Sequence, residues 1–189
     1  MKEKEEIKNI IVGVTGSIAA YKACEIVSRL RKDGYTTRVI MTGAATKFIT
    51  PLTLETLSGN RVYCNMFEEG DWQPEHVRLA ELADLILVAP ATADVIAKLA
   101  AGIADELLTS VVLAAGSCPV VVAPAMNEAM YNNKITQANI KKLRSCGLVF
   151  VAPEKGWLAC GSEGAGRLAE PLRIVERVKE ILVKKNTSK

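Results

Sequence analysis

The chain has 189 residues, of which 49% are hydrophobic and 24% charged, a composition typical of a globular domain and not of a disordered one. A net charge of +3, with no internal basic run that contains aromatic residues, argues against nucleic-acid binding. Five cysteines without a CxxC pair argue against a disulfide framework and a zinc site, and no apolar run has membrane-spanning length, so we expect a reduced, cytoplasmic protein without metal.

Short apolar runs alternate with helical stretches along the chain. The runs predict strands at 10–15, 37–41, 85–89, 120–123 and 148–151. The periodic stretches predict helices at 19–31, 94–100, 106–115, 133–146 and 174–183, and Gly34 is expected to stop the first of them. Loops are expected at 59–74 and 153–171, and long loops in compact domains are often functional.

This pattern predicts the fold class. Continuous apolar strands suit a parallel sheet buried on both faces, and their alternation with helices implies right-handed crossovers. We therefore expect an α/β fold, a Rossmann-like (flavodoxin-like) doubly wound parallel sheet. One domain is predicted over 1–189, with solvated tails at 1–8 and 184–189.

The turns that follow the first two strands could bind an anion. In doubly wound sheets, ligands bind beyond the carboxyl ends of the strands. Gly16 and Ser17 open the first helix, where free amides and a hydroxyl form an anion site, although a turn with an N-cap would need the same residues. Their spacing fits neither GxGxxG nor a P-loop, which disfavours a standard dinucleotide or nucleotide site. Thr42 follows the second strand, as a ligand or as a helix cap.

The turns after the third and fourth strands are built from small residues. Ala91–Ala93 and Ala125 would let a planar ligand approach the backbone. Asp94 could accept a hydrogen bond from a ring N–H, and Asn127 offers an amide to a ligand in the cleft. As helix N-caps, these two residues would need no ligand at all.

Two further residues are candidates for chemistry. His76 is the only histidine, and so the one side chain that titrates near neutral pH without a special environment, although a lone histidine is more often structural. Cys160 lies in a glycine-rich segment with Gly161, Gly164 and Gly166, which favours an accessible thiol on a moving flap over a buried structural thiol.

Four motifs resemble one family, the homo-oligomeric flavin-containing cysteine decarboxylases. They are GSIAAYK at 16–22, PATAD at 90–94, PAMNEAMY at 124–131 and ACGSEGAGRLAE at 159–170. The resemblance extends from about residue 8 to residue 183, and the four motifs in this order are specific together although none is decisive alone. Asp94 departs from the pattern, because some members carry Asn there, which leaves the hydrogen bonding at the flavin open.

The resemblance implies roles for the candidate residues. Gly16, Ser17 and Thr42 would hold the phosphate of FMN. The residues implied to contact the flavin are Ile18, Phe48, Ala91, Thr92, Ala93, Asp94 and Ala125. Met126 and Asn127 would bind the substrate, with Asn127 at its carboxylate. His76 would be the essential acid–base residue and Cys160 the cysteine of the reducing step.

The implied activity is FMN-dependent decarboxylation of 4'-phosphopantothenoylcysteine to 4'-phosphopantetheine in coenzyme A biosynthesis. A cysteine-type carboxylate has no electron sink for the carbanion that loss of CO₂ leaves. Oxidation of its CH₂–SH to a thioaldehyde supplies that sink, and a flavin can take the hydride. Decarboxylation then gives an enethiolate, which is reduced to the product, so the cycle needs neither NAD nor a metal.

Other readings remain open within the same fold. A peptidyl-cysteine decarboxylase, a flavin prenyltransferase and a non-enzymatic regulatory relative are the alternatives, whereas a plain NAD-binding domain would need GxGxxG. The resemblance also implies a homo-trimer or a dodecamer with FMN between subunits. Whether the chain stands alone or belongs to a fusion with the synthetase is left open by the sequence.

Overall fold

A parallel sheet forms the centre of the computed structural model, which describes residues 8–67, 74–157 and 163–187. Within these residues the sheet has six strands, in the order β3-β2-β1-β4-β5-β6, and all the pairings are parallel. The strands are β1 (Asn9–Val14), β2 (Thr36–Met41), β3 (Val62–Tyr63), β4 (Leu85–Ala91), β5 (Val120–Pro124) and β6 (Val149–Phe150). This is the Rossmann order of a doubly wound sheet, whose reversal point lies between β1 and β4.

The apolar strands build one core on each face of the sheet. Alternate side chains of a strand point to opposite faces. Accordingly, Ile10 and Val12 belong to one buried cluster and Ile11 to the other, and all three are fully buried. Continuous apolar runs are therefore needed because both faces are covered, as the sequence predicted.

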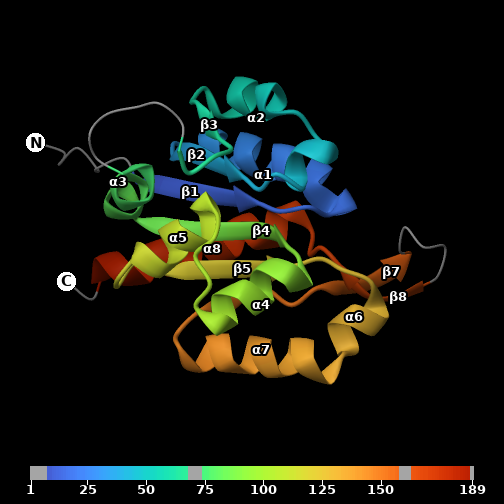
Figure 1. Cartoon of the computed structure of the whole chain (residues 1–189). Helices are drawn as coiled ribbons and strands as arrows, with labels where there is room; N and C mark the ends of the chain where they lie inside the picture. The colour runs from blue at the N-terminus through green and yellow to red at the C-terminus, as the bar shows by residue number, and fades with distance from the viewer. Residues whose placement is uncertain (1–7, 68–73, 158–162, 188–189) are drawn as a thin grey trace, which may run out of the picture.

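Helices cover both faces of the sheet (Figure 1). Packed on the first core are α1 (Tyr21–Lys32), α2 (Pro51–Ser58) and α8 (Pro171–Thr187). Packed on the second core are α3 (Glu75–Leu82), α4 (Ala93–Ala101), α5 (Leu107–Ala114) and α7 (Lys134–Ser145). Gly34, at a φ of 89°, follows the end of α1 as expected. No helix in the described ranges is both long and apolar enough to span a bilayer.

The five predicted strands and five predicted helices are confirmed, but other elements were missed. They are β3, α2, α3, the short helix α6 (Glu128–Asn132) and the antiparallel hairpin of β7 (Glu154–Trp157) and β8 (Glu163–Arg167). The loop predictions for 59–74 and 153–171 are thus wrong over β3 and the hairpin. These strands are two to five residues long and β8 contains two glycines, so they lack an apolar run. The helix α8 continues to Thr187, into the predicted tail.

The carboxyl ends of the strands form the end of the molecule that carries the hairpin. In Figure 1, β7, β8 and α6 lie at this end, and α3 lies at the opposite end, near the start of β1. The backbone N–H of Asp84, just after α3, donates to the carbonyl of Asn9 at 2.9 Å, which fixes that placement. The turns predicted to bind a ligand therefore share one end of the sheet.

Candidate functional site

A buried threonine ties the first and third of these turns together. The Thr15 hydroxyl donates to the carbonyl of Pro90 at 2.8 Å and accepts from the backbone N–H of Thr92 at 3.0 Å. Thr15 is fully buried, so no water competes for these bonds. The two turns on either side of the reversal point are thereby held in one geometry. Thr15 was predicted only as the last residue of a strand, so this role was missed.

Ser17 and Thr42 present hydroxyl groups from neighbouring turns. Ser17 caps the 3-10 helix Ile18–Ala20, because its Oγ accepts from the N–H of Ala19 at 3.3 Å. Thr42 Oγ1 accepts from the N–H of Ala45 at 3.2 Å. Each hydroxyl acts here as an acceptor, and no described residue accepts its hydrogen, so both can donate to an anion. Capping and anion binding are therefore compatible at these positions.

Gly16 lets the first two turns approach each other. A Cβ atom at Gly16 would lie 2.4 Å from the Cβ of Ala44, far inside van der Waals contact. The close approach brings Ser17 and Thr42 to the wall of one cavity. A glycine is needed here for its lack of a side chain, since its φ is not positive.

One cavity, the strand-end cavity, joins the turns that follow β1, β2, β4 and β5. It has a volume of about 610 Å³. Its lining residues are Gly16, Ser17, Thr42, Ala44, Thr92, Ala93, Asp94, Val95, Lys98, Glu106, Ala125, Met126 and Met130. Thr92 caps α4 by accepting from the N–H of Val95, so Asp94 is not the cap that the sequence allowed. Most of the candidate residues therefore meet in one place.

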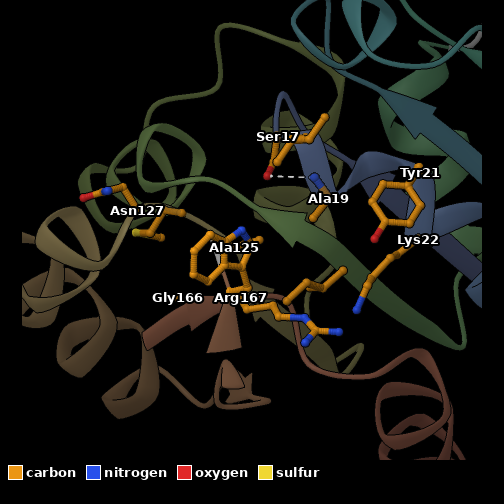
Figure 2. A pocket seen from close by; sticks show the side chains of 12 residues that line it. Ser17, Ala19, Tyr21, Lys22, Ala125, Asn127, Gly166 and Arg167 are labelled. Carbon is orange, nitrogen blue, oxygen red and sulfur yellow. Dashed lines mark hydrogen bonds between the residues drawn. The ribbon is translucent and has the colours of Figure 1, made fainter. Parts of the chain in front are cut away.

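A second cavity, the side cavity, adjoins the first and has a volume of about 390 Å³ (Figure 2). It is lined by Ser17, Ile18, Ala19, Tyr21, Lys22, Ala125, Met126, Asn127, Trp157, Gly166, Arg167 and Leu168. Ser17, Ala125 and Met126 line both cavities. Asn127 caps α6, with its Oδ1 accepting from the N–H of Ala129 at 2.8 Å. A ligand in the side cavity would therefore lie beside a ligand in the strand-end cavity.

The hairpin forms one wall of the side cavity because β8 docks on the segment after β5. The N–H of Met126 donates to the carbonyl of Gly166 at 3.0 Å, and the N–H of Ala165 donates to the Glu128 carboxylate at 3.0 Å. A Cβ at Gly166 would lie 2.3 Å from the Met126 carbonyl oxygen, and its φ is 125°. A glycine is therefore required at this contact for two independent reasons.

Charged side chains that the sequence analysis did not single out lie on the strand-end cavity. Lys98 Nζ lies 3.1 Å from an oxygen of Asp105, 3.7 Å from one of Asp94 and 3.8 Å from Glu106 Oε1. Burial opposes the charge of Lys98, but the hydrogen bond with Asp105 and the neighbouring carboxylates outweigh it and raise the pKa of Lys98. Burial also raises the pKa of Glu106, against the attraction of Lys98. Glu106 Oε1 is buried and has no hydrogen-bond partner among the described residues.

Some predicted site residues lie away from both cavities. Ala91 is fully buried in the sheet and reaches the site only through its carbonyl, which accepts from the N–H of Ala125 at 3.0 Å. Phe48 is 47% exposed after the 3-10 helix Ala45–Lys47 and does not line either cavity. His76 is half-buried on α3 and does not line them either. Cys160 lies outside the described residues.

Comparison with known proteins gives the family. A family model described as Flavoprotein matches residues 1–183. The chain belongs to the flavoprotein family. A probable phosphopantothenoylcysteine decarboxylase of Streptococcus mutans is 48% identical over 177 residues, which cover 93% of this chain and 99% of that protein. The bifunctional coenzyme A biosynthesis protein CoaBC of Borreliella burgdorferi is 48% identical over 169 residues, 89% of this chain but 43% of that protein. The chain thus spans less than half the length of the bifunctional relatives it matches.

Solved structures of flavoprotein relatives share the fold. A PPC decarboxylase mutant complexed with pantothenoylaminoethenethiol has a TM-score of 0.83 at 28% identity, over 93% of this chain and 98% of that one. The FMN-dependent cysteine decarboxylase SpaF has a TM-score of 0.76 at 33% identity, over 92% and 98% of the two chains. The α/β fold predicted from the sequence is therefore confirmed.

The strand-end cavity fits a flavin, the cofactor class of this flavoprotein family. The hydroxyls of Ser17 and Thr42 can donate to a phosphate, and Ala93 and Ala125 leave room for a flat ring. The buried Glu106 Oε1 offers an acceptor to a donor on the ligand. Donors, space and an unsatisfied acceptor are thus combined in one cavity.

Replacing Gly16 with Ala is expected to weaken flavin binding by about ten- to hundredfold, because overpacking of this size costs about 1–3 kcal/mol. The new methyl group would push the turn of Ser17 away from Ala44. Gly43→Ala is the matched control, since a Cβ at Gly43 meets no atom within 4 Å. Flavin dissociation constants from fluorescence quenching test the prediction, with thermal unfolding of the flavin-free proteins as a check on folding. Equal affinities of the two variants would contradict it.

Proposed function

We propose that the chain catalyses the FMN-dependent decarboxylation of 4'-phosphopantothenoylcysteine to 4'-phosphopantetheine. The observation that carries this proposal is the pair of adjoining cavities, which share Ser17, Ala125 and Met126 and so allow a cofactor and a substrate to meet. Sequence similarity supports the choice of substrate, because the relative from Streptococcus mutans is a probable phosphopantothenoylcysteine decarboxylase. The match covers 93% of this chain and 99% of that protein. A solved relative complexed with pantothenoylaminoethenethiol supports it further.

FMN, and not FAD, is the flavin that we propose. The turn of Gly16 and Ser17, together with Thr42, offers one place for a phosphate, which suits a mononucleotide. Thr92, Ala93, Asp94 and Ala125 would line the ring. Ile18 and Ala91 are the remaining contacts that we propose within the protomer, and Phe48 would reach the flavin from a neighbouring subunit. When bound, the flavin supplies a hydride acceptor and donor, which the amino-acid side chains do not provide.

The protein side chains would bind the substrate and move protons. Asn127 and Met126 lie on the wall of the side cavity, and we assign them to the substrate, with the Asn127 amide at the carboxylate. His76 is assigned as the acid–base group for thiol oxidation and decarboxylation, and Cys160 as the proton donor to the enethiolate.

The cofactor and substrate are tested together by one experiment. Purified protein should show a flavin spectrum, and the released chromophore should have the mass of FMN. Incubation with 4'-phosphopantothenoylcysteine should release CO₂ and give 4'-phosphopantetheine by mass spectrometry. A peptide ending in cysteine serves as the competing substrate. Turnover of the peptide alone would favour a peptidyl-cysteine decarboxylase, and a colourless protein that FMN does not reconstitute would refute both.

The position of His76 supports a site shared between subunits. His76 and the exposed Phe48 do not line the cavities of their own protomer, so a second copy would have to bring them to the flavin. We therefore propose a homo-trimer, or a dodecamer built from trimers, in the cytoplasm. Sedimentation of the flavin-loaded protein at micromolar concentration is expected to show trimers or larger species. A monomer that retains full turnover would refute the shared site.

A further inference from the structure

Two cations line the side cavity, and the proposed function has not used either. Lys22 lies on α1 and Arg167 on β8, and Figure 2 shows their side chains pointing toward each other from opposite sides of the cavity. The side chain of Lys22 is only 10% exposed, whereas that of Arg167 is 42% exposed. A lysine this deeply buried needs a charged partner or a charged ligand, because an unpaired buried charge is costly.

Glu170 is the partner of both cations. Its Oε1 lies 2.7 Å from Arg167 Nη2 and 3.2 Å from Lys22 Nζ. Two positive groups thus share one oxygen of one carboxylate, and the trio keeps a net charge of +1. An ammonium has three N–H donors and a guanidinium five, so each cation has donors left after its bond to Glu170. The arrangement holds the cations close together and leaves donors available for an anion.

Apart from Ser17 and Asn127, the rest of the side cavity is mostly apolar, and it is partly open to solvent. Ile18 is 58% exposed, Tyr21 60% and Trp157 71%, although side chains of this kind are usually buried. They would cover the apolar part of a ligand whose anionic end lies at the cations. Ser17, Ala125 and Met126 also line the side cavity, and they are shared with the strand-end cavity. The cavity therefore suits an elongated ligand that has an anion at one end and its reacting end at the cofactor.

From these observations we infer that the side cavity binds the phosphorylated arm of the substrate, with Arg167 and Lys22 as its phosphate-recognition pair. Glu170 is the positioning residue that holds the pair in place. The inference rests on the proposed function and adds a basis for specificity, since a substrate without a phosphomonoester has no group for these cations. Arg167 is the more exposed of the two and provides the guanidinium geometry that suits phosphate oxygens.

The test compares 4'-phosphopantothenoylcysteine with its dephosphorylated form, pantothenoylcysteine, on the flavin-loaded enzyme. Arg167→Met should raise the KM for the phosphorylated substrate by about ten- to hundredfold, the effect of one charge-assisted hydrogen bond. The KM for the dephosphorylated substrate should change by less than about threefold, and kcat for either should stay within a few-fold. Arg167→Lys keeps the charge and should give an intermediate KM.

Arg177→Met is the matched control, because Arg177 pairs with Glu180 at 2.7 Å with the same three-residue spacing, in the exposed part of α8. This variant should behave as the wild type with both substrates.

Calorimetric binding of 4'-phosphopantetheine and of pantetheine gives the same comparison without turnover. An Arg167→Met variant that loses both substrates equally, or neither, overturns the inference and leaves the proposed function intact. A wild-type enzyme that decarboxylates neither substrate refutes the proposed function, and the inference with it.

Discussion

Replacing His76 with Asn is expected to lower turnover by about two to four orders of magnitude, the usual contribution of a general acid–base group. His76 is the only histidine of the chain, so no second imidazole can take over its protons. Asn keeps a similar size and a hydrogen-bonding group but does not titrate near neutral pH. Because His76 lines neither cavity of its own protomer, FMN content and thermal stability should stay close to those of the wild type.

A mixing experiment separates a role in the neighbouring subunit from a structural one. Gly16→Ala chains should bind flavin poorly but keep His76, whereas His76→Asn chains bind flavin and lack the imidazole. If His76 acts on the flavin site of a neighbouring copy, mixed assemblies of the two variants should regain part of the activity that each lacks alone. Turnover of His76→Asn within a few-fold of the wild type would reduce His76 to a structural residue.

The sequence predicted the sheet well because burial on both faces leaves a strong pattern. β1, β4 and β5 are short, mainly aliphatic runs that end at Pro124 or just before Thr15 and Thr92, and each was predicted within about two residues at either end. β3 and the hairpin leave no such pattern, because β3 is only two residues long and β8 reads Glu-Gly-Ala-Gly-Arg. The glycines of β8 are explained by contacts with Met126 and Glu128, residues distant in the chain, so no local rule could have identified the strand.

The site residues that follow strand ends could be predicted from the sequence. Gly16, Thr42, Thr92 and Ala125 follow strand ends, and parallel strands bring their carboxyl ends to one edge. The charged residues were missed because their roles depend on ion pairs that form only when separate elements of the chain come together. Lys98 of α4, for example, forms ion pairs with Asp105 and Glu106, which lie in the segment just before α5. The trio that Glu170 forms with Lys22 and Arg167 likewise exists only in the folded chain, where Lys22 of α1 meets Glu170 in the segment between β8 and α8.

The second large effect is expected for Cys160→Ser. Cys160 lies between β7 and β8 in the sequence, and both strands contribute residues to the side cavity, namely Trp157 from β7 and Gly166 and Arg167 from β8. A thiol suits proton donation to an enethiolate because the acidities of the two sulfur groups are similar, whereas a serine hydroxyl is a far weaker acid. Oxidation and decarboxylation of the substrate should therefore proceed in the variant, and the reducing step should stall.

The mass of the accumulated product shows which step is blocked in the Cys160→Ser variant. Mass spectrometry should find a decarboxylated compound lighter than 4'-phosphopantetheine by two hydrogens, and absorbance should show reduced flavin until oxygen is admitted.

Cys146→Ser is the matched control, because Cys146 is an exposed thiol at the end of α7, and its replacement should leave the normal product unchanged. A merely structural Cys160 would lower stability and slow all steps together, without the lighter product. Normal product at a normal rate, or a block before CO₂ release, would remove Cys160 from the reducing step. The position of the block therefore separates a proton donor from a packing residue, which a loss of activity alone would not do.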